Sequence, residues 1–506
     1  MANFIVEDKK YTLEEIYSLS ESGLRLRLSP AVTHKIQSSR RVLESVLESG
    51  KTVYGVNTGF GKLSQVKISD SQITQLQQNL LLSHAAGVGN PVESSLVRLM
   101  MVLKVLSLSK GYSGIRTELV EKLTELINHG LIPLVPEKGS VGASGDLAPL
   151  SHMSLPLIGE GKIKVDSGYI TSVTALKKEG ISPLTLSFKE GLALINGTQF
   201  STAYGVIYLC KLHRLTKIAD IAGALSVEGI LGTDTAFLEK VQSLKHHPGQ
   251  AESAANLYQL LQDSEIHRSH EDCERVQDMY SIRCMPQVHG ASRDTLRAAS
   301  KIIENEVNAV SDNPLIFPDG EVISAGNFHA EHAAQAMDMA AIAAAELGNI
   351  SERRIYTLTK GEFDLPPFLI SNPGVNSGVM MSQVTAAALA SENKGLAHPA
   401  SVDSIPTGAD QEDHVSMAPW AGRKLKAIVE NLESILAIEI LCACQAITLR
   451  GGLQPAKRLI PIMNIVREVV PELLEDRIQS EDISLILTLI QSGKLLATIE
   501  KESKLQ

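Results

Sequence analysis

The sequence predicts a mainly α-helical fold, in which a loop-rich N-terminal region is followed by a bundle of long helices. Apolar residues recur at helical spacing through the second half, and residues 329–354 form an alanine-rich stretch of high helix propensity. Strand signals are few. No Pro-rich or Ser-rich linker interrupts the chain. We therefore expect a loop-rich region over residues 1–200 and a long helical bundle over 201–506, joined in one continuous architecture.

The individual elements follow from local patterns. One small hairpin is expected over 161–170, where side chains alternate around a turn, and glycine-rich ordered loops are expected over 54–61 and 139–145. The last long helix starts near Arg423, because its apolar residues keep helical spacing. These apolar residues are Leu425, Ile428, Val429, Leu432, Ile435 and Leu436. Four further helices are expected over 94–110, 118–128, 200–227 and 295–311.

Composition excludes several classes of protein. The 506 residues carry 47 basic and 57 acidic side chains, a net charge of −10, which argues against a general nucleic-acid binder. The most apolar window, 434–449, is too short to span a membrane and contains Glu439. Aromatic residues are only 4% of the chain, so the core must be filled mainly by aliphatic side chains.

The cysteines and the N-terminus indicate a cytoplasmic protein. Five cysteines are an odd, sparse set that does not suit a disulfide scaffold, and no secretory h-region follows Met1. Cys442 and Cys444 lie in an apolar helical stretch and are expected to be buried thiols. The pair His329 and Glu331 resembles the H-x-E of zinc deaminases, but no P-C-x-x-C follows, so we expect no metal.

The most unusual segment is GSVGASGDLAPLS at residues 139–151. A nucleophile elbow would need glycine two positions after Ser144, where Asp146 stands, and neither phosphate-loop pattern fits. A flexible surface loop is disfavoured by the apolar sequence on both sides. The segment therefore reads as an anchored, buried loop.

The tripeptide Ala143-Ser144-Gly145 offers a chemical explanation for the segment. The amide nitrogen of Gly145 can attack the carbonyl carbon of Ala143, a closure that small residues permit. Loss of water from this ring and from the Ser144 side chain then yields 4-methylideneimidazol-5-one. This group is a strong electrophile of a kind that no standard side chain provides, and it needs no external cofactor.

The segment resembles the signature of the aromatic amino acid ammonia-lyases, and the resemblance extends over almost the whole chain. The further matching blocks are YGVNTGFG at 54–61, NGT at 196–198, QDMYSIRC at 277–284, GNFH at 326–329 and QEDH at 411–414. The resemblance implies a helical fold of the fumarase/aspartase-like superfamily. It also implies a homotetramer in which each active site draws residues from more than one subunit.

The resemblance also implies roles for individual residues. The electrophile captures the substrate, through its amine or through its ring. Tyr54 is the candidate base for the β-proton, and Tyr280 is a second phenol that assists. Arg283 is the candidate for the substrate carboxylate, because its guanidinium fork can hold both oxygens. Supporting roles in substrate binding fall to Asn196, Gln277 and Phe328.

Two residues favour L-histidine as the small-molecule substrate, with trans-urocanate and ammonia as products. Glu412 can pair with an imidazole N–H but would be costly to bury against a bare phenyl ring. His84, in the run Ser-His-Ala-Ala-Gly, resembles the histidine-specific members of the family. The alternatives are a tyrosine or phenylalanine ammonia-lyase, an aminomutase with the same electrophile, and an inactive helical scaffold.

Overall fold

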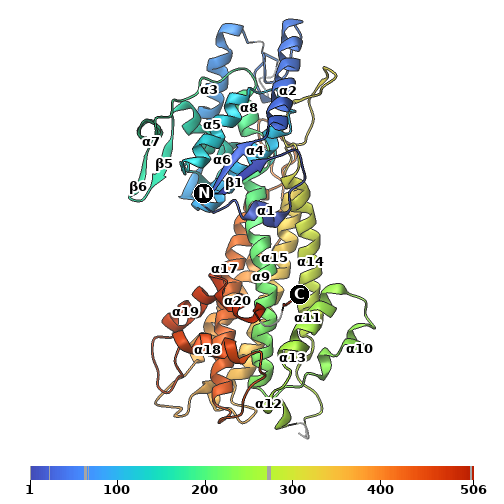
Figure 1. The fold of residues 1–506 in the computed structure, drawn as a ribbon, viewed down its shortest axis with the longest axis vertical. Helices are drawn as coiled ribbons and strands as arrows, with labels where there is room; N and C mark the ends of the chain where they lie inside the picture. The colour runs from blue at the N-terminus through green and yellow to red at the C-terminus, as the bar shows by residue number, and fades with distance from the viewer. Residues whose placement is uncertain (1, 22, 62–64, 67, 271–274, 502–503) are drawn as a thin grey trace. The chain divides into compact units, whose positions relative to one another are not determined.

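The computed structural model confirms the predicted fold class, because most of the chain is helical and the strands are short (Figure 1). The structure describes the chain except for residues 1, 22, 62–64, 67, 271–274 and 502–503. The described strands pair only in twos. The β1–β2 pair is parallel, and the β3–β4, β5–β6 and β7–β8 pairs are antiparallel.

The chain divides into two compact units, each assembled from three segments. Unit 1 comprises residues 1–210, 300–338 and 399–423, and unit 2 comprises residues 211–299, 339–398 and 424–506. Four long helices contribute residues to both units: α9 (Gln199–Gly229), α14 (Met285–Val307), α15 (Glu331–Thr359) and α17 (Ala418–Thr448). The boundary near residue 200, between the loop-rich region and the long helices, remains a proposal.

Unit 1 contains all the strands and several shorter helices. Its strands are β1 (Ala2–Val6), β2 (Leu24–Leu28), β3 (Val88–Pro91), β4 (Pro136–Lys138), β5 (Lys162–Val165), β6 (Gly168–Thr171), β7 (Leu315–Ile316) and β8 (Val322–Ile323). Its helices are α1 (Leu13–Tyr17), α2 (Pro30–Glu48), α3 (Ile73–His84), α4 (Ser94–Ser109), α5 (Thr117–Asn128), α6 (Leu147–Ser154), α7 (Ser172–Glu179) and α8 (Glu190–Ile195). Short 3₁₀ turns lie at Asp70–Gln72 and Leu155–Ile158.

Unit 2 contains helices joined by loops, and no strand among its described residues. Its helices are α10 (Glu239–Gln242), α11 (Pro248–Leu260), α12 (Glu265–Arg268), α13 (Tyr280–Arg283), α16 (Met380–Leu396), α18 (Ile460–Val469), α19 (Gln479–Gln491) and α20 (Lys494–Glu500). Short 3₁₀ turns lie at Thr235–Phe237 and Pro367–Leu369. The last three helices, α18 to α20, pack against one another.

All the predicted helices and the hairpin are present, with differences at their ends. Helix α14 begins ten residues before the predicted position 295, because Pro286 occupies its first turn, where no backbone N–H is needed. The hairpin is β5–β6, with Lys162 opposite Thr171. The predicted helix over 423–436 is part of α17, which extends to Thr448.

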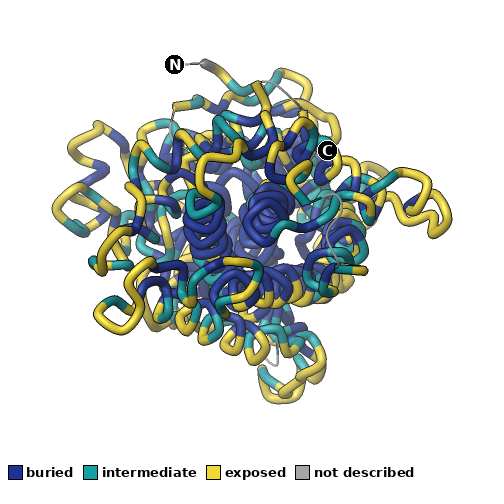
Figure 2. Tube along the Cα trace, turned by 90° about the horizontal axis from the view of Figure 1, so that it is seen from below, coloured by how far each residue is buried: buried dark blue, intermediate teal, exposed yellow. Residues whose placement is uncertain are grey.

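The core is aliphatic, as the low aromatic content predicted. The predicted apolar residues of α17 are fully buried, and so are most alanines of α15. Helices at the centre of Figure 2 are buried along most of their visible length, and exposed residues lie mainly in the surrounding loops. Cys442 and Cys444 are buried free thiols, and burial raises the pKa of both. Cys273 lies outside the described residues.

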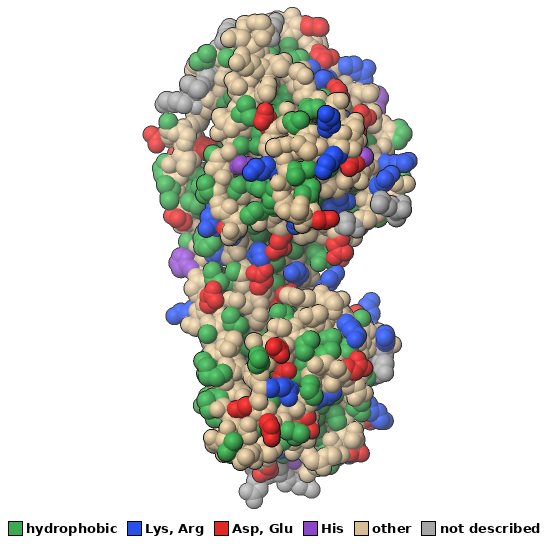
Figure 3. All heavy atoms as spheres, turned by 90° about the vertical axis from the view of Figure 1, so that its left-hand side faces the viewer, with side chains coloured by type: hydrophobic (Ala, Val, Ile, Leu, Met, Phe, Trp, Pro, Cys, Tyr) green, Lys and Arg blue, Asp and Glu red, His purple; other side chains and the backbone are tan. Residues whose placement is uncertain are grey.

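The surface in Figure 3 mixes acidic, basic and apolar side chains over the face shown. No single described helix is long and apolar enough to cross a membrane. The bent pair Gln479–Gln491 and Lys494–Glu500, with an angle of 56° between its helices, passes the same test by length and composition.

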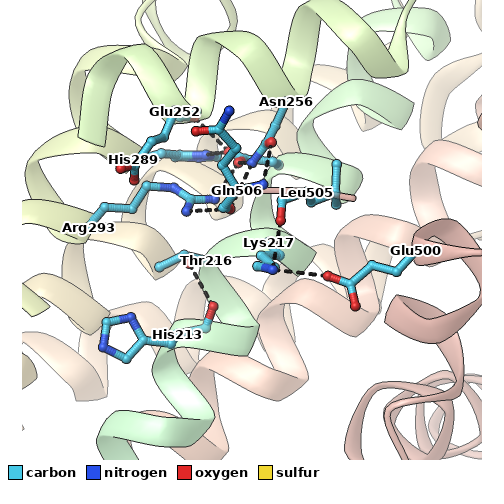
Figure 4. Close-up of polar contacts among 12 residues, drawn as sticks. His213, Thr216, Lys217, Glu252, Asn256, His289, Arg293, Glu500, Leu505 and Gln506 are labelled. Carbon is cyan, nitrogen blue, oxygen red and sulfur yellow. Dashed lines mark hydrogen bonds and ion pairs between the residues drawn. The ribbon is translucent and has the colours of Figure 1, made fainter. Parts of the chain in front are cut away.

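A buried polar network holds the last residues of the chain against unit 2 (Figure 4). Arg293 donates to the carbonyl of Gln506 at 2.9 Å, and Asn256 exchanges two hydrogen bonds with the Gln506 backbone. Lys217 donates to the carbonyl of Leu505, whose side chain is buried. Figure 4 shows these groups converging on the tail from α9, α11 and α14.

Asp220 is the buried anion of this network. It accepts from Arg293 at 2.6 Å and from His289 Nδ1 at 2.7 Å, and Ser253 and Asn256 also donate to it. Burial alone would raise the pKa of Asp220, but the positive charge of Arg293 and the bond from His289 outweigh burial and hold it at about 2.

The depressed pKa of Asp220 predicts acid sensitivity of unit 2. Because the folded pKa lies below the ordinary value, the stabilisation is complete above about pH 4 and is lost as pH falls through about 2. We expect the difference in unfolding free energy between wild type and Asp220→Asn to shrink by about 2 kcal/mol over this range. Urea unfolding of both proteins at a series of decreasing pH values measures this difference in unfolding free energy. A difference that is independent of pH would contradict the prediction.

Candidate functional site

One pocket of about 1330 Å³ collects seven of the predicted site residues within unit 1. These seven residues are Tyr54, His84, Ala143, Ser144, Asn196, Phe328 and Glu412. They come from segments far apart in sequence: two loops, the end of α3, the turn before α6, the end of α8 and the segment before α17. Gly145 completes the predicted tripeptide directly beside Ser144.

The turn that carries Ser144 is fixed from both sides. Gly142 and Gly145 have φ of +69° and +79°, values that favour glycine. The carbonyl of Gly142 accepts from the Ala330 backbone N–H at 3.2 Å, and Met417 N–H donates to the Val141 carbonyl at 2.8 Å. The segment is therefore an anchored loop, as predicted.

Gly145 lies against the backbone of Gly197 with no space for a side chain. A Cβ at Gly145 would lie 2.3 Å from the Gly197 carbonyl oxygen, and the two residues form a parallel β-bridge. This contact holds the 143–145 segment in a bent conformation at the N-terminus of α9. The same contact explains why the third residue of the tripeptide is glycine.

Substituting Gly145 by alanine is therefore expected to disrupt the turn. The methyl group would clash with backbone and would also require a strained φ, so the segment must shift. We expect Gly145→Ala to show no loss of the two waters by intact mass and to have a lower Tm than wild type. Gly180→Ala is the matched control for φ, because Gly180 has φ +70° with open space around its Cβ position. A fully dehydrated Gly145→Ala chain would contradict this account.

Asp146 anchors the tripeptide to α9. Its carboxylate accepts from the Ser201 backbone N–H at 2.9 Å and from the Ser201 hydroxyl at 2.6 Å, so it caps the first turn of α9. Its backbone N–H donates to the Gly197 carbonyl at 2.8 Å. Burial raises the pKa of Asp146 to about 6, against the opposing hydrogen bonds from Ser201.

Asn196 lies at the base of the pocket and is held by buried polar groups. Its side-chain amide donates to the Asn313 carbonyl at 2.9 Å. Lys104, fully buried on α4, donates to the carbonyls of Ala193 and Asn196 at 3.1 and 2.5 Å. Burial lowers the pKa of Lys104 to about 7. Asn196 is therefore fixed through both its backbone and its side chain.

Tyr54 lies on a tight loop that packs against α8. The oxygen of its phenol accepts from the Gly61 backbone N–H at 3.1 Å. Gly55, with φ +64°, leaves no room for a Cβ beside Leu192. Phe328 is half-buried on another part of the pocket wall.

His84 ends α3 with one ring nitrogen facing its own helix. Nδ1 lies 2.9 Å from the Leu80 carbonyl, which can only accept, so Nδ1 carries the proton and Nε2 is an acceptor. Burial lowers the pKa of His84, although the Leu80 carbonyl and the charge of Glu412 oppose that shift. The ring is therefore neutral at pH 7.

Glu412 contacts Ser144 directly. The Ser144 hydroxyl donates to Glu412 Oε1 at 2.5 Å, and the Thr407 hydroxyl donates to Oε2 at 2.6 Å. Thr407 and Glu412 also exchange two backbone hydrogen bonds across a turn. Both oxygens of the carboxylate are therefore held in place.

Besides Gly145, which adjoins the pocket through Ser144, three predicted site residues do not line this pocket. Gln277, Tyr280 and Arg283 belong to unit 2, at and before the short helix α13. Tyr280 is 70% exposed, and the Arg283 guanidinium stacks on its ring at 4.7 Å. Arg283 Nε is buried without a hydrogen-bond partner in the part of the chain that the structure describes.

A family model described as aromatic amino acid lyase matches residues 11–468. The chain belongs to the aromatic amino acid lyase family. This lyase is 49% identical over 487 residues to histidine ammonia-lyase of Salmonella typhimurium, with 96% of each chain covered.

Several solved structures share the fold of this lyase. The crystal structure of histidine ammonia-lyase from Trypanosoma cruzi matches with a TM-score of 0.92 at 41% identity, covering 99% of this chain and 95% of that one. Tyrosine aminomutase from Streptomyces globisporus matches with a TM-score of 0.94 at 34% identity, covering 100% of both chains. Global fold similarity therefore does not separate these activities, and the pocket residues must do so.

Sequence reasoning missed the residues that support the lyase site. Lys104 was detectable as a cation inside the apolar sequence of α4, an unusual position for a charge. Asp146 gave a weaker signal, because its capping partner Ser201 lies 55 residues away. Thr407 gave no signal, since only the folded turn brings it to Glu412.

Proposed function

We propose that this lyase eliminates ammonia from L-histidine to give trans-urocanate, and that it acts in the cytoplasm. The proposal rests on one observation. Ser144, Glu412 and His84 line the same pocket, and the Ser144 hydroxyl donates to Glu412. The names of the relatives agree with this substrate.

The residues present fit 4-methylideneimidazol-5-one. Ala143-Ser144-Gly145 is bent and fixed, and Ser144 lines the pocket. When formed, this group supplies an electrophilic methylene that binds the substrate and makes its nitrogen a better leaving group. The group requires no external cofactor, since all its atoms come from the chain.

Glu412 and His84 provide acceptors for an imidazole. The Glu412 carboxylate and His84 Nε2 both accept hydrogen bonds, and an imidazole ring offers an N–H to either one. A phenyl ring offers no donor, so it would leave these polar groups without partners. A site that is built to bind a polar ring strongly disfavours the apolar analogue.

Tyr54 is proposed to take the β-proton, and its place on the pocket wall supports this role. The Gly61 N–H that donates to its oxygen fixes the position of the phenol. Asn196 is held rigidly enough to orient the substrate without moving.

The described residues that line the pocket provide no lysine or arginine for the substrate carboxylate. The pocket instead presents Glu412 and Asp413. Its volume also exceeds the roughly 300–1,000 Å³ typical of small-molecule sites. We propose that Arg283 of another copy enters the pocket, bringing Gln277 and Tyr280 with it.

The exposed residues around α13 support such an assembly. Val276 is 98% exposed and Tyr280 is 70% exposed, although an apolar and an aromatic side chain are favoured in interfaces rather than in water. We propose a homotetramer in which each active site is shared between copies.

The substrate panel tests the proposed function. Purified protein, with both waters lost by intact mass, is given L-histidine, L-tyrosine or L-phenylalanine in separate samples, and ultraviolet absorbance is followed. We expect urocanate from histidine, with a kcat/KM for histidine at least about 10²-fold above that for either other amino acid. Coumarate or cinnamate as the main product would support the alternatives instead, and a β-amino acid would indicate an aminomutase.

A further inference from the structure

The contact between Ser144 and Glu412 involves the serine before it has reacted. The Ser144 hydroxyl donates to Glu412 Oε1 at 2.5 Å. This hydroxyl must leave in the second dehydration, so the contact cannot persist in the mature protein. Glu412 Oε1 therefore has the Ser144 hydroxyl as its partner before maturation and needs another partner afterwards.

The second dehydration requires a proton at the departing oxygen. The Ser144 Cα–H bond and the Cβ–Oγ bond break, a Cα=Cβ double bond forms, and the oxygen leaves as water only if it receives a proton. Hydroxide is a poor leaving group, so a positioned acid accelerates such a step. The ring closure that precedes it loses the Ala143 oxygen with the amide hydrogens of Ser144 and Gly145, which accounts for the first water.

Glu412, and not the neighbouring Asp146, is placed to give a proton to the serine oxygen. Both oxygens of Asp146 are engaged by Ser201, in the first turn of α9. Glu412 touches the departing oxygen itself, and Thr407 fixes its other oxygen at 2.6 Å. The turn that carries Glu412 is rigid, since Thr407 and Glu412 form two backbone hydrogen bonds and the residues between them include three consecutive left-handed positions, 408–410.

We propose that Glu412 acts twice: it delivers the proton with which the Ser144 oxygen leaves as water, and it then binds the imidazole of the substrate with the oxygen so released. In the first role the Glu412 carboxylate, which accepts from the Ser144 hydroxyl in this structure, first takes up a proton from water and then donates it to Ser144 Oγ. The Cα proton passes to water in exchange, so no other reactant is consumed. The second role rests on the proposed function, and the first does not.

Because Glu412 acts in both steps, maturation must precede substrate binding. In the unprocessed chain both carboxylate oxygens of Glu412 are occupied, one by Thr407 and one by Ser144. Removal of the hydroxyl opens Oε1 towards the pocket, next to the new electrophile. The residue that completes the electrophile thus becomes available to the substrate only when the electrophile exists.

The test is the intact mass of Glu412→Gln, followed over time after synthesis. The amide keeps the size of the side chain and can still bond to Ser144, but it cannot supply an acidic proton. We expect fewer than about a tenth of Glu412→Gln chains to have lost both waters when all wild-type chains have done so. The remaining chains should have lost one water or none.

Two further variants keep the test decisive. Glu412→Asp retains the acid with a shorter reach, so we expect it to lose both waters faster than Glu412→Gln. His84→Gln lies in the same pocket but bonds to Leu80 rather than to Ser144, and we expect it to lose both waters as wild type does. Melting temperatures identify any variant that has not folded.

The outcomes separate this inference from the proposed function. Complete dehydration of Glu412→Gln at the wild-type rate would overturn the role in maturation, whatever the substrate is. A fully dehydrated wild type that does not convert histidine would overturn the proposed function and leave the first role standing.

Discussion

Substituting Ser144 by alanine is expected to abolish both the modification and the activity. Alanine has no hydroxyl to lose, so the exocyclic methylene cannot form and the pocket keeps only ordinary side chains. We expect kcat for histidine to fall by at least about 10⁴-fold, the scale seen when the central group of a covalent mechanism is removed. Steady-state urocanate formation and the intact mass of the same sample measure this effect.

Ser324→Ala is the matched control for this variant. Ser324 lines the same pocket, but its hydroxyl bonds to Asn313 rather than to the reactive turn. We expect Ser324→Ala to lose both waters like wild type. A Ser144→Ala enzyme with full activity would show that the reaction does not need the electrophile at all.

Replacing Arg283 by methionine is expected to have the second largest effect. Methionine fills a similar volume but cannot hold the substrate carboxylate, so the α-carbon loses its alignment and the carboxylate loses its ionic partner. We expect kcat/KM for histidine to fall by about 10²- to 10³-fold, as when one member of a buried ion pair is removed.

The same variant should mature normally, because Arg283 belongs to unit 2 and does not line the pocket of its own copy. Arg283→Lys keeps the charge without the bidentate fork and should recover part of the loss. Unchanged kcat/KM in purified, fully dehydrated Arg283→Met would remove Arg283 from the site.

Local patterns in the sequence were sufficient for most of the long helices. Apolar residues at helical spacing predicted α17, and high alanine content predicted α15, because helix propensity and burial act in the same direction there. Helix α2 was missed although Ser29 and Pro30 give a sequence signal for its start, and Ser29 does cap it.

The candidate site was predictable only in part. The glycine pattern identified the turn that carries Ser144, because the backbone geometry at position 145 leaves room only for glycine. The proposed distribution of the site residues between two copies has no comparable signature in the sequence. Tyr280 and Arg283 look like members of the same site in sequence, yet the pocket around Ser144 contains neither.

The central claim is that one copy supplies the reactive turn with the imidazole pocket while another copy supplies Arg283. Ser144→Ala and Arg283→Met chains carrying different tags can be co-expressed, and the doubly tagged assemblies purified. Random pairing of the two chains leaves one site in four with both groups intact, and removing the assemblies made of one chain type raises this to about two sites in seven for a tetramer. We therefore expect a little more than a quarter of the wild-type urocanate formation from histidine. Doubly tagged assemblies no more active than either variant alone would contradict the claim.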